Sequence, residues 1–113
     1  MQTSYENVVS NLFAATQIQP VVAGAGIISA GEGDLVRGTL LTTTDGVKYT
    51  VVKEGEDVLA VLAVDVNAES DTEAALYFTG EFNKKALVAA EGVDIDTLLL
   101  SARKVGIFIK ENQ

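Results

Sequence analysis

The sequence predicts a small, mainly β domain with one short helix near the C-terminus. Hydrophobic residues make up 48% of the 113 residues and aromatic residues only 6%, so most of the apolar content is small or branched and suits strands. Short apolar runs alternate with glycine-containing turns, whereas one later stretch has helical spacing. The chain is long enough for one hydrophobic core and too short for two.

The first twenty residues mix polar side chains with apolar ones at helical spacing. The apolar positions follow an i, i+3, i+4 pattern, and Ser4 suits a helix N-cap. Because so short a helix is marginal in isolation, we expect a flexible N-terminal arm that becomes ordered only when docked. It either packs back on its own domain or binds a partner. The residues that would dock are Tyr5, Val8, Val9, Leu12 and Phe13.

The next segments read as strands and a hairpin. Residues 21–29 are extended in character, and the glycine-rich residues 31–34 form a flexible connection. Residues 36–44 and 47–52 flank Asp45-Gly46, a pair that suits a two-residue type I′ turn. This pattern predicts a β-hairpin.

Two further strands follow a charged turn at residues 53–57. Residues 58–64 are apolar on both faces, which indicates a strand covered on one side by its own core and on the other by a neighbour. Residues 74–82 form the next strand. The acidic residues 65–73 between them are expected to be a solvated loop.

The C-terminal part contains the predicted helix. Residues 86–90 are compatible with either strand or helix. After them, Asp94 or Asp96 caps a helix that Gly106 ends, with a strand at residues 107–109 closing the fold. The apolar stripe of this helix is Ile95, Leu98, Leu99, Ala102 and Val105, and its last turn carries Arg103 and Lys104, which favour the helix dipole.

Charge and residue usage exclude several functions. The formal net charge is −8, from 16 acidic and 8 basic residues, so we expect no direct nucleic-acid partner and no acidic membrane surface as a partner. No cysteine or histidine is present, which excludes disulfides, thiolate sites and histidine-based catalysis. No positively charged leader and no span of membrane length is found, so we expect a soluble protein made in the cytoplasm. A lone subunit should expose apolar surface, which favours oligomerisation.

No motif in the chain predicts an enzyme, a cofactor or a metal site. Residues 24–29 half-match a dinucleotide fingerprint, but Ser29 replaces the third glycine and no helix follows. Residues 65–73 resemble a calcium loop but have Ser70 where glycine is needed and Leu76 where the bidentate glutamate belongs. The carboxylates of residues 54–57 have neither an apolar pocket nor aromatic platforms in sequence, and Thr42 to Thr44 lack a nearby general base.

Several short sequence motifs, in their order along the chain, resemble those of the lambda-like phage head decoration proteins. The matching motifs are Arg37-Gly38-Thr39-Leu40, residues 61–66, Tyr77-Phe78-Thr79-Gly80-Glu81-Phe82-Asn83 and Lys104-Val105-Gly106-Ile107, together with Ser4-Tyr5-Glu6-Asn7 and Pro20-Val21-Val22 near the start. These motifs span nearly the whole chain.

The resemblance implies a β-clip-like small barrel or ribbon that forms a homotrimer. It divides the chain into a capsid-binding arm, residues 1–20, and one β-rich trimerising domain, residues 21–113. Its partner would be the major capsid protein on the outer surface of the virion, at three-fold and quasi-three-fold sites, where it stabilises the shell against genome pressure after synthesis in the host cytoplasm. The alternative is an acidic β-module that binds carbohydrate or a host receptor, with Tyr49 and Tyr77 as aromatic platforms.

Overall fold

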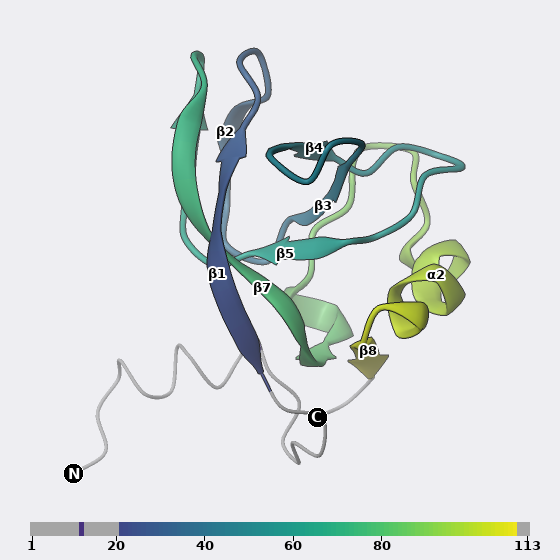
Figure 1. Ribbon diagram of the computed structural model, residues 1–113. Helices are drawn as coiled ribbons and strands as arrows, with labels where there is room; N and C mark the ends of the chain where they lie inside the picture. Colours follow the sequence, from purple (N-terminus) through teal and green to yellow (C-terminus); the bar gives the residue numbers. More distant parts are fainter. Residues whose placement is uncertain (1–11, 13–20, 111–113) are drawn as a thin grey trace, which may run out of the picture.

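The computed structural model describes Leu12 and residues 21–110. Within these residues the chain is mainly β, with one short helix near the C-terminus (Figure 1). The strands are β1 (Val22–Ile28), β2 (Gly33–Leu35), β3 (Leu40–Thr43), β4 (Lys48–Val51), β5 (Ala60–Leu62), β6 (Val66–Ala68), β7 (Thr72–Asn83) and β8 (Ile107–Lys110). The helical elements are the 3₁₀ turns η1 (Lys84–Ala86) and η2 (Ile95–Leu98) and the α-helix α2 (Leu99–Lys104).

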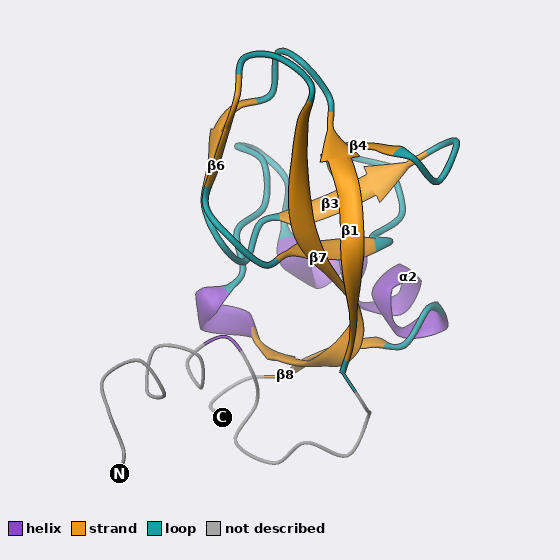
Figure 2. Cartoon of the chain, turned by 60° about the vertical axis from the view of Figure 1, so that its left-hand side comes forward, coloured by secondary structure: helices purple, strands orange, loops and turns teal. Residues whose placement is uncertain are grey.

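Five strands close into a small barrel in the order β1-β4-β3-β5-β7, and the pairing of β1 with β7 completes the ring. β1 pairs antiparallel with β7 and parallel with β4. β7 is long enough to continue past the barrel, where its last residues pair in parallel with β8. Figure 2 shows β1 and β7 side by side along the barrel, with β8 at its lower end. The predicted mainly β fold with a short C-terminal helix is therefore confirmed.

The core is divided into two clusters on either side of β5. Val61 packs in the cluster that also contains Phe82 and Leu98. Ala60 and Leu62 point the other way, into the cluster around Tyr49 and Ile28. The doubly apolar run is thus buried on both faces as predicted, but this one chain supplies both covering layers.

The predicted hairpin of β3 and β4 is confirmed, but the prediction of a two-residue turn between these strands is wrong. Thr43 pairs with Tyr49, so residues 44–47 lie outside the strands. The Asp45 carboxylate accepts hydrogen bonds from the backbone N–H groups of Val47 and Lys48 at 2.8 and 2.9 Å. The Thr43 hydroxyl accepts another from Gly46 N–H at 2.9 Å. These side chains satisfy the backbone of a wider loop.

A two-stranded ribbon, β2 with β6, replaces two segments that were expected to be loops. Asp34 pairs with Asn67, and the Asn67 side-chain amide donates to the Asp34 carboxylate at 2.5 Å. The strands have three residues each and carry polar side chains. Their sequences contain no alternation long enough to predict a strand.

The C-terminal helix begins and ends at the expected signals. Asp94, and not Asp96, is the cap: its carboxylate accepts from the N–H of Asp96 at 3.0 Å. The first turn is 3₁₀, the α-helix ends with Arg103 and Lys104, and Gly106 takes the left-handed φ of 90° at the C′ position. Of residues 86–90, Ala86 ends the 3₁₀ turn η1, and the others form no regular strand or helix; Val88 makes an isolated parallel bridge to Thr39. No helix in the described part of the chain is both long and apolar enough to cross a membrane.

Candidate functional site

Leu12 is the one member of the predicted docking set that the structure describes, and it lies in the domain core. Its side chain is 1% exposed and belongs to the same cluster as Leu40, Val52 and Leu87. Tyr5, Val8, Val9 and Phe13 lie outside the described residues. Leu12 therefore packs on its own domain.

The glycines of the half-matched dinucleotide motif are explained by packing. Gly24 and Gly26 lie within β1, and the element that follows is strand β2. A Cβ on Gly24 would lie 2.5 Å from the ring of Phe78, and one on Gly26 would lie 2.6 Å from the ring of Tyr49. Glycine lets the two aromatic rings approach the strand backbone.

The carboxylates of the putative calcium loop form structural contacts. Asp65 accepts from the N–H of Arg37 at 2.7 Å, and Asp71 accepts from the N–H of Ala30 at 2.8 Å. Asp71 also pairs with Lys48 at 2.8 Å, and this hydrogen bond, followed by the one from Ala30, holds the pKa of Asp71 below its usual value. No group of three or more histidine, cysteine, aspartate or glutamate side chains suited to a metal occurs among residue 12 and residues 21–110. The loop carboxylates tie β6 and β7 to neighbouring strands.

The Asp71–Lys48 pair predicts a definite pH dependence. Because the pKa of Asp71 is lowered from 3.8, its contribution to stability is present above that value and disappears as the pH falls through the folded-state pKa. The pKa of Lys48 is raised from 10.5, mainly by the hydrogen bond to Asp71, so its share is lost as the pH rises through the raised value. In denaturant titrations, Asp71→Asn should be slightly less stable than wild type near neutral pH. A deficit that does not shrink as the pH falls below 3.8 would contradict this explanation.

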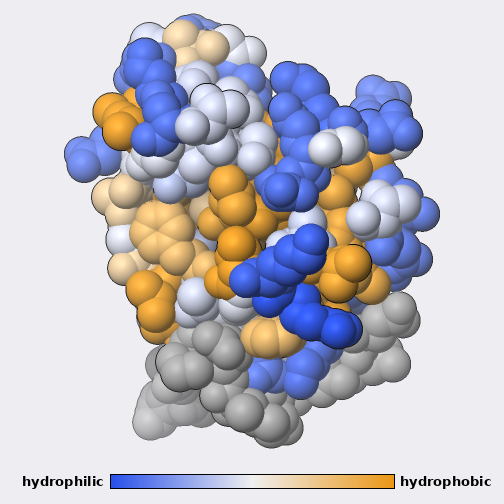
Figure 3. Space-filling view, turned by 45° about the vertical axis from the view of Figure 1, so that its right-hand side comes forward, coloured by the Kyte–Doolittle hydropathy of each residue, from blue (hydrophilic) through white to orange (hydrophobic). Residues whose placement is uncertain are grey.

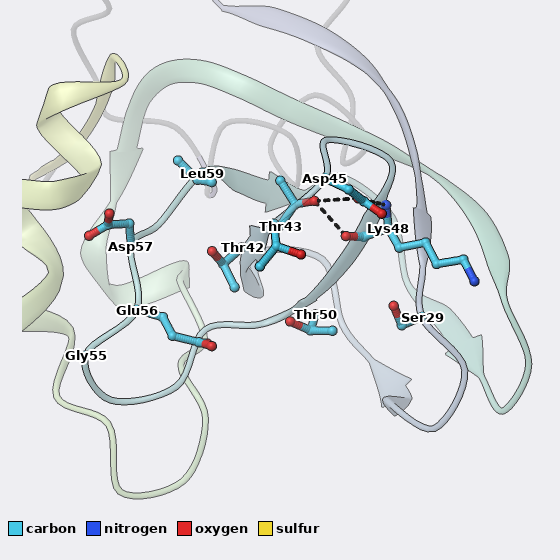
Figure 4. A pocket seen from close by; sticks show the side chains of 11 residues that line it. Ser29, Thr42, Thr43, Asp45, Lys48, Thr50, Gly55, Glu56, Asp57 and Leu59 are labelled. Atoms are coloured by element: carbon cyan, nitrogen blue, oxygen red, sulfur yellow. Dashed lines mark hydrogen bonds between the residues drawn. The ribbon is translucent and has the colours of Figure 1, made fainter.

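A hollow of about 530 Å³ lies beside the acidic turn of residues 54–57 (Figure 4). Glu56 and Asp57 lie on one side of it and Ser29 and Lys48 on the other. Five of its eleven lining residues carry hydroxyl groups and four are charged, and Leu59 is the only large apolar side chain that lines it in the described part of the chain. The hollow is therefore lined mainly by residues with polar or charged side chains.

The polar groups around this hollow are engaged in local structure. Glu56 accepts from the N–H of Lys53 at 2.8 Å, which closes its own turn. The Thr43 hydroxyl donates to the carbonyl oxygen of Lys48 at 2.7 Å. Asp57 points away from the threonine side chains (Figure 4). A carboxylic acid in an apolar pocket, as glycoside cleavage requires, is not formed by Glu56 or Asp57.

Exposed apolar side chains are the feature that the sequence could not locate. Among the described residues, eight large hydrophobic side chains are more than a third exposed. In Figure 3, apolar surface lies between strongly hydrophilic side chains on the side that carries α2. They are Val21, Val22, Val36, Val47, Val64, Val88, Leu100 and Val105. Composition predicted that such surface exists, whereas its position depends on which strands the barrel buries.

The two tyrosines proposed as carbohydrate platforms belong to the packed interior. Tyr49 is 6% exposed and lies 6.5 Å, ring centroid to ring centroid, from Phe78. Tyr77 is partly buried against the first cluster, with its ring centroid 6.0 Å from that of Phe82. Tyr49 thus offers no open ring face to a sugar.

Comparison with known proteins identifies the family. A search of curated proteins finds no match to this chain. The family model described as bacteriophage lambda head decoration protein D matches residues 3–104, which include the segment before Pro20, the whole barrel and α2. Members of this family are structural components of the phage head and are not an enzyme class. The chain therefore belongs to the bacteriophage lambda head decoration protein family.

Proposed function

We propose that this protein binds as a homotrimer to the outer surface of an icosahedral phage head, at three-fold and quasi-three-fold sites, and stabilises the shell against internal genome pressure. The observation that carries the proposal is the family match over residues 3–104, which covers both the barrel and the segment before Pro20. The major capsid protein is the proposed partner.

The segment of residues 1–20 is the proposed capsid-binding arm, and residues 21–113 are the proposed trimerising domain. Within the arm, Tyr5, Val8, Val9 and Phe13 supply apolar contacts to the shell. Leu12, the fifth member of the set, is buried in the domain. We therefore assign it first to anchoring the arm, and a capsid contact would require it to leave the core.

A trimer makes weak arms effective. Ordering a short polar and apolar segment costs conformational entropy, so one arm alone should bind weakly. Three arms on one body bind a symmetric site with an avidity that exceeds a single arm's by roughly 10² to 10⁴. The subunit charge of −8 gives 3 × −8 = −24 per trimer, which disfavours nonspecific association in free solution.

Deleting residues 2–11 tests the arm while keeping the buried Leu12. This truncation keeps Leu12, whereas a deletion through residue 16 would also remove a buried core side chain and mix two effects. We expect a folded protein of wild-type oligomeric mass that no longer binds shells assembled from the major capsid protein, as measured by co-sedimentation. Full shell binding by a truncated protein with wild-type thermal stability would refute the arm's role.

A further inference from the structure

An apolar groove with an acidic rim lies between β2, β4 and the segment of residues 88–90. Its volume is about 290 Å³, and Val36 and Val88 line it while remaining 49% and 39% exposed. The other lining residues are Asp34, Leu35, Thr39, Val51, Ala89 and Ala90. The groove wall is held in place by backbone hydrogen bonds from Leu40 N–H to Val88 at 2.9 Å and from Val88 N–H to Gly38 at 3.0 Å. The groove therefore exists in the isolated subunit.

The rim of the groove carries negative charge. Asp34 lines it directly, and the exposed Glu91 follows Ala90 in the chain. The Glu32 carboxylate accepts a hydrogen bond from the N–H of Val51, another lining residue, at 3.0 Å. A partner for this groove should present an apolar side chain flanked by positive charge.

The outward face of α2 has this composition. Leu100 is 63% exposed, the highest value among the large hydrophobic residues described. Arg103 and Lys104 follow it at i+3 and i+4, so the three side chains share one face of the helix. Neither cation forms an ion pair within the described residues, whereas the chain's other adjacent basic pair contains Lys84, which binds Asp96 at 2.6 Å.

We propose that α2 of one subunit docks into the acid-rimmed groove of the next copy of this chain, with Leu100 between Val36 and Val88 and the two cations against the acidic rim. The inference rests on the trimer proposed above and names the surfaces that form it. Two subunits of charge −8 repel each other overall. A contact that places α2 on the groove brings opposite charges together.

Because the α2 surface around Leu100 and the groove are different patches of the subunit, the contact is heterologous. Such a contact forms a closed ring if the rotation that relates neighbouring subunits is a whole fraction of a turn. This property allows a complementation test. Leu100→Asp removes the apolar side chain that docks, and Val88→Asp places a charge in the groove. Each variant alone should therefore have the mass of a monomer in sedimentation equilibrium. An equal mixture should form a heterodimer, because an intact α2 on the Val88→Asp subunit still meets an intact groove on the Leu100→Asp subunit. Val47→Asp, at the hairpin tip, changes a valine whose exposure of 53% lies between those of Leu100 and Val88, and it should remain trimeric.

Charge reversal provides a second test, which does not depend on burying a carboxylate. Lys104→Glu should weaken association at least tenfold at low salt, and adding Glu91→Lys should restore it. Trimers formed by both aspartate variants, or monomers that do not pair when mixed, would overturn the interface while leaving shell binding by the arm intact. A monomeric wild type that still decorates shells would overturn both the trimer and this interface, but not decoration itself.

Discussion

Replacing Leu12 by alanine should lower the free energy of unfolding by about 2–5 kcal/mol, although the residue belongs to the segment predicted to bind a partner. The side chain is 1% exposed and lies in the cluster that contains Phe82, the largest fully buried residue. Truncation removes the transfer free energy of the deleted carbons and leaves a cavity that the surrounding strands can fill only in part. Since a domain of this kind has about 5–15 kcal/mol in total, the loss is a large fraction of its stability.

Denaturant titration of the free protein measures this effect, and two variants calibrate it. Leu98→Ala removes the same side chain from the same cluster, at a residue that is 3% exposed, and should lose a similar amount. Val22→Ala, which is 50% exposed at the start of β1, should stay close to wild type. If Leu12→Ala unfolds like Val22→Ala, then Leu12 does not contribute to the core of the free subunit.

Gly38→Ala should be strongly destabilising, because it combines a left-handed backbone with a steric overlap. Gly38 has a φ of 100°, a conformation that costs an L-residue roughly 1–3 kcal/mol. In addition, a Cβ at this position would overlap the carbonyl oxygen of Ala86, which is backbone and cannot rotate away. The N–H of Gly38 donates to Leu62 at 2.8 Å and its carbonyl accepts from Val88 at 3.0 Å, so any movement breaks contacts on both sides.

Gly31→Ala is the matched control, because it separates the conformational cost from the steric one. Gly31 has a similar φ of 92°, but nothing lies within 4 Å of a Cβ added there. Both variants should be destabilised, with Gly38→Ala losing about 1–3 kcal/mol more because of the overlap. Equal midpoints in urea denaturation would show that residues 86–88 can shift at little cost, and would weaken the description of the groove as preformed.

Several local features could be predicted because their physical cause lies within a few residues. The helix cap at Asp94 and the left-handed Gly106 follow from backbone groups that a helix leaves unpaired at its two ends. The hairpin followed from two apolar runs around Asp45-Gly46, although the loop widened because Thr43 and Asp45 supply hydrogen bonds that a tight turn would make between strands.

Other features could not be predicted because their cause lies far away in sequence. The β2–β6 ribbon joins three-residue strands about thirty residues apart, and neither strand has a pattern of its own. The acid-rimmed groove brings β2 next to residues 88–90. The burial of Leu12 depends on a cluster that includes Leu40, Val61, Phe82, Leu98 and Ile107, each from a different strand or helical turn. In each case the partner, and not the local sequence, determines the outcome.

The sequence by itself determined the mainly β class and the positions of most strands and of the C-terminal helix, because strand and helix periodicities and turn residues act locally. It also carries the ordered motifs by which the family is identified. Only the tertiary structure decided how β1 closes the barrel against β7, which of the apolar residues stay exposed, and that Leu12 is a core residue. The physical reason is that burial is a property of the packed barrel: the same leucine is 1% exposed at position 12 and 63% exposed at position 100, according to what packs against it.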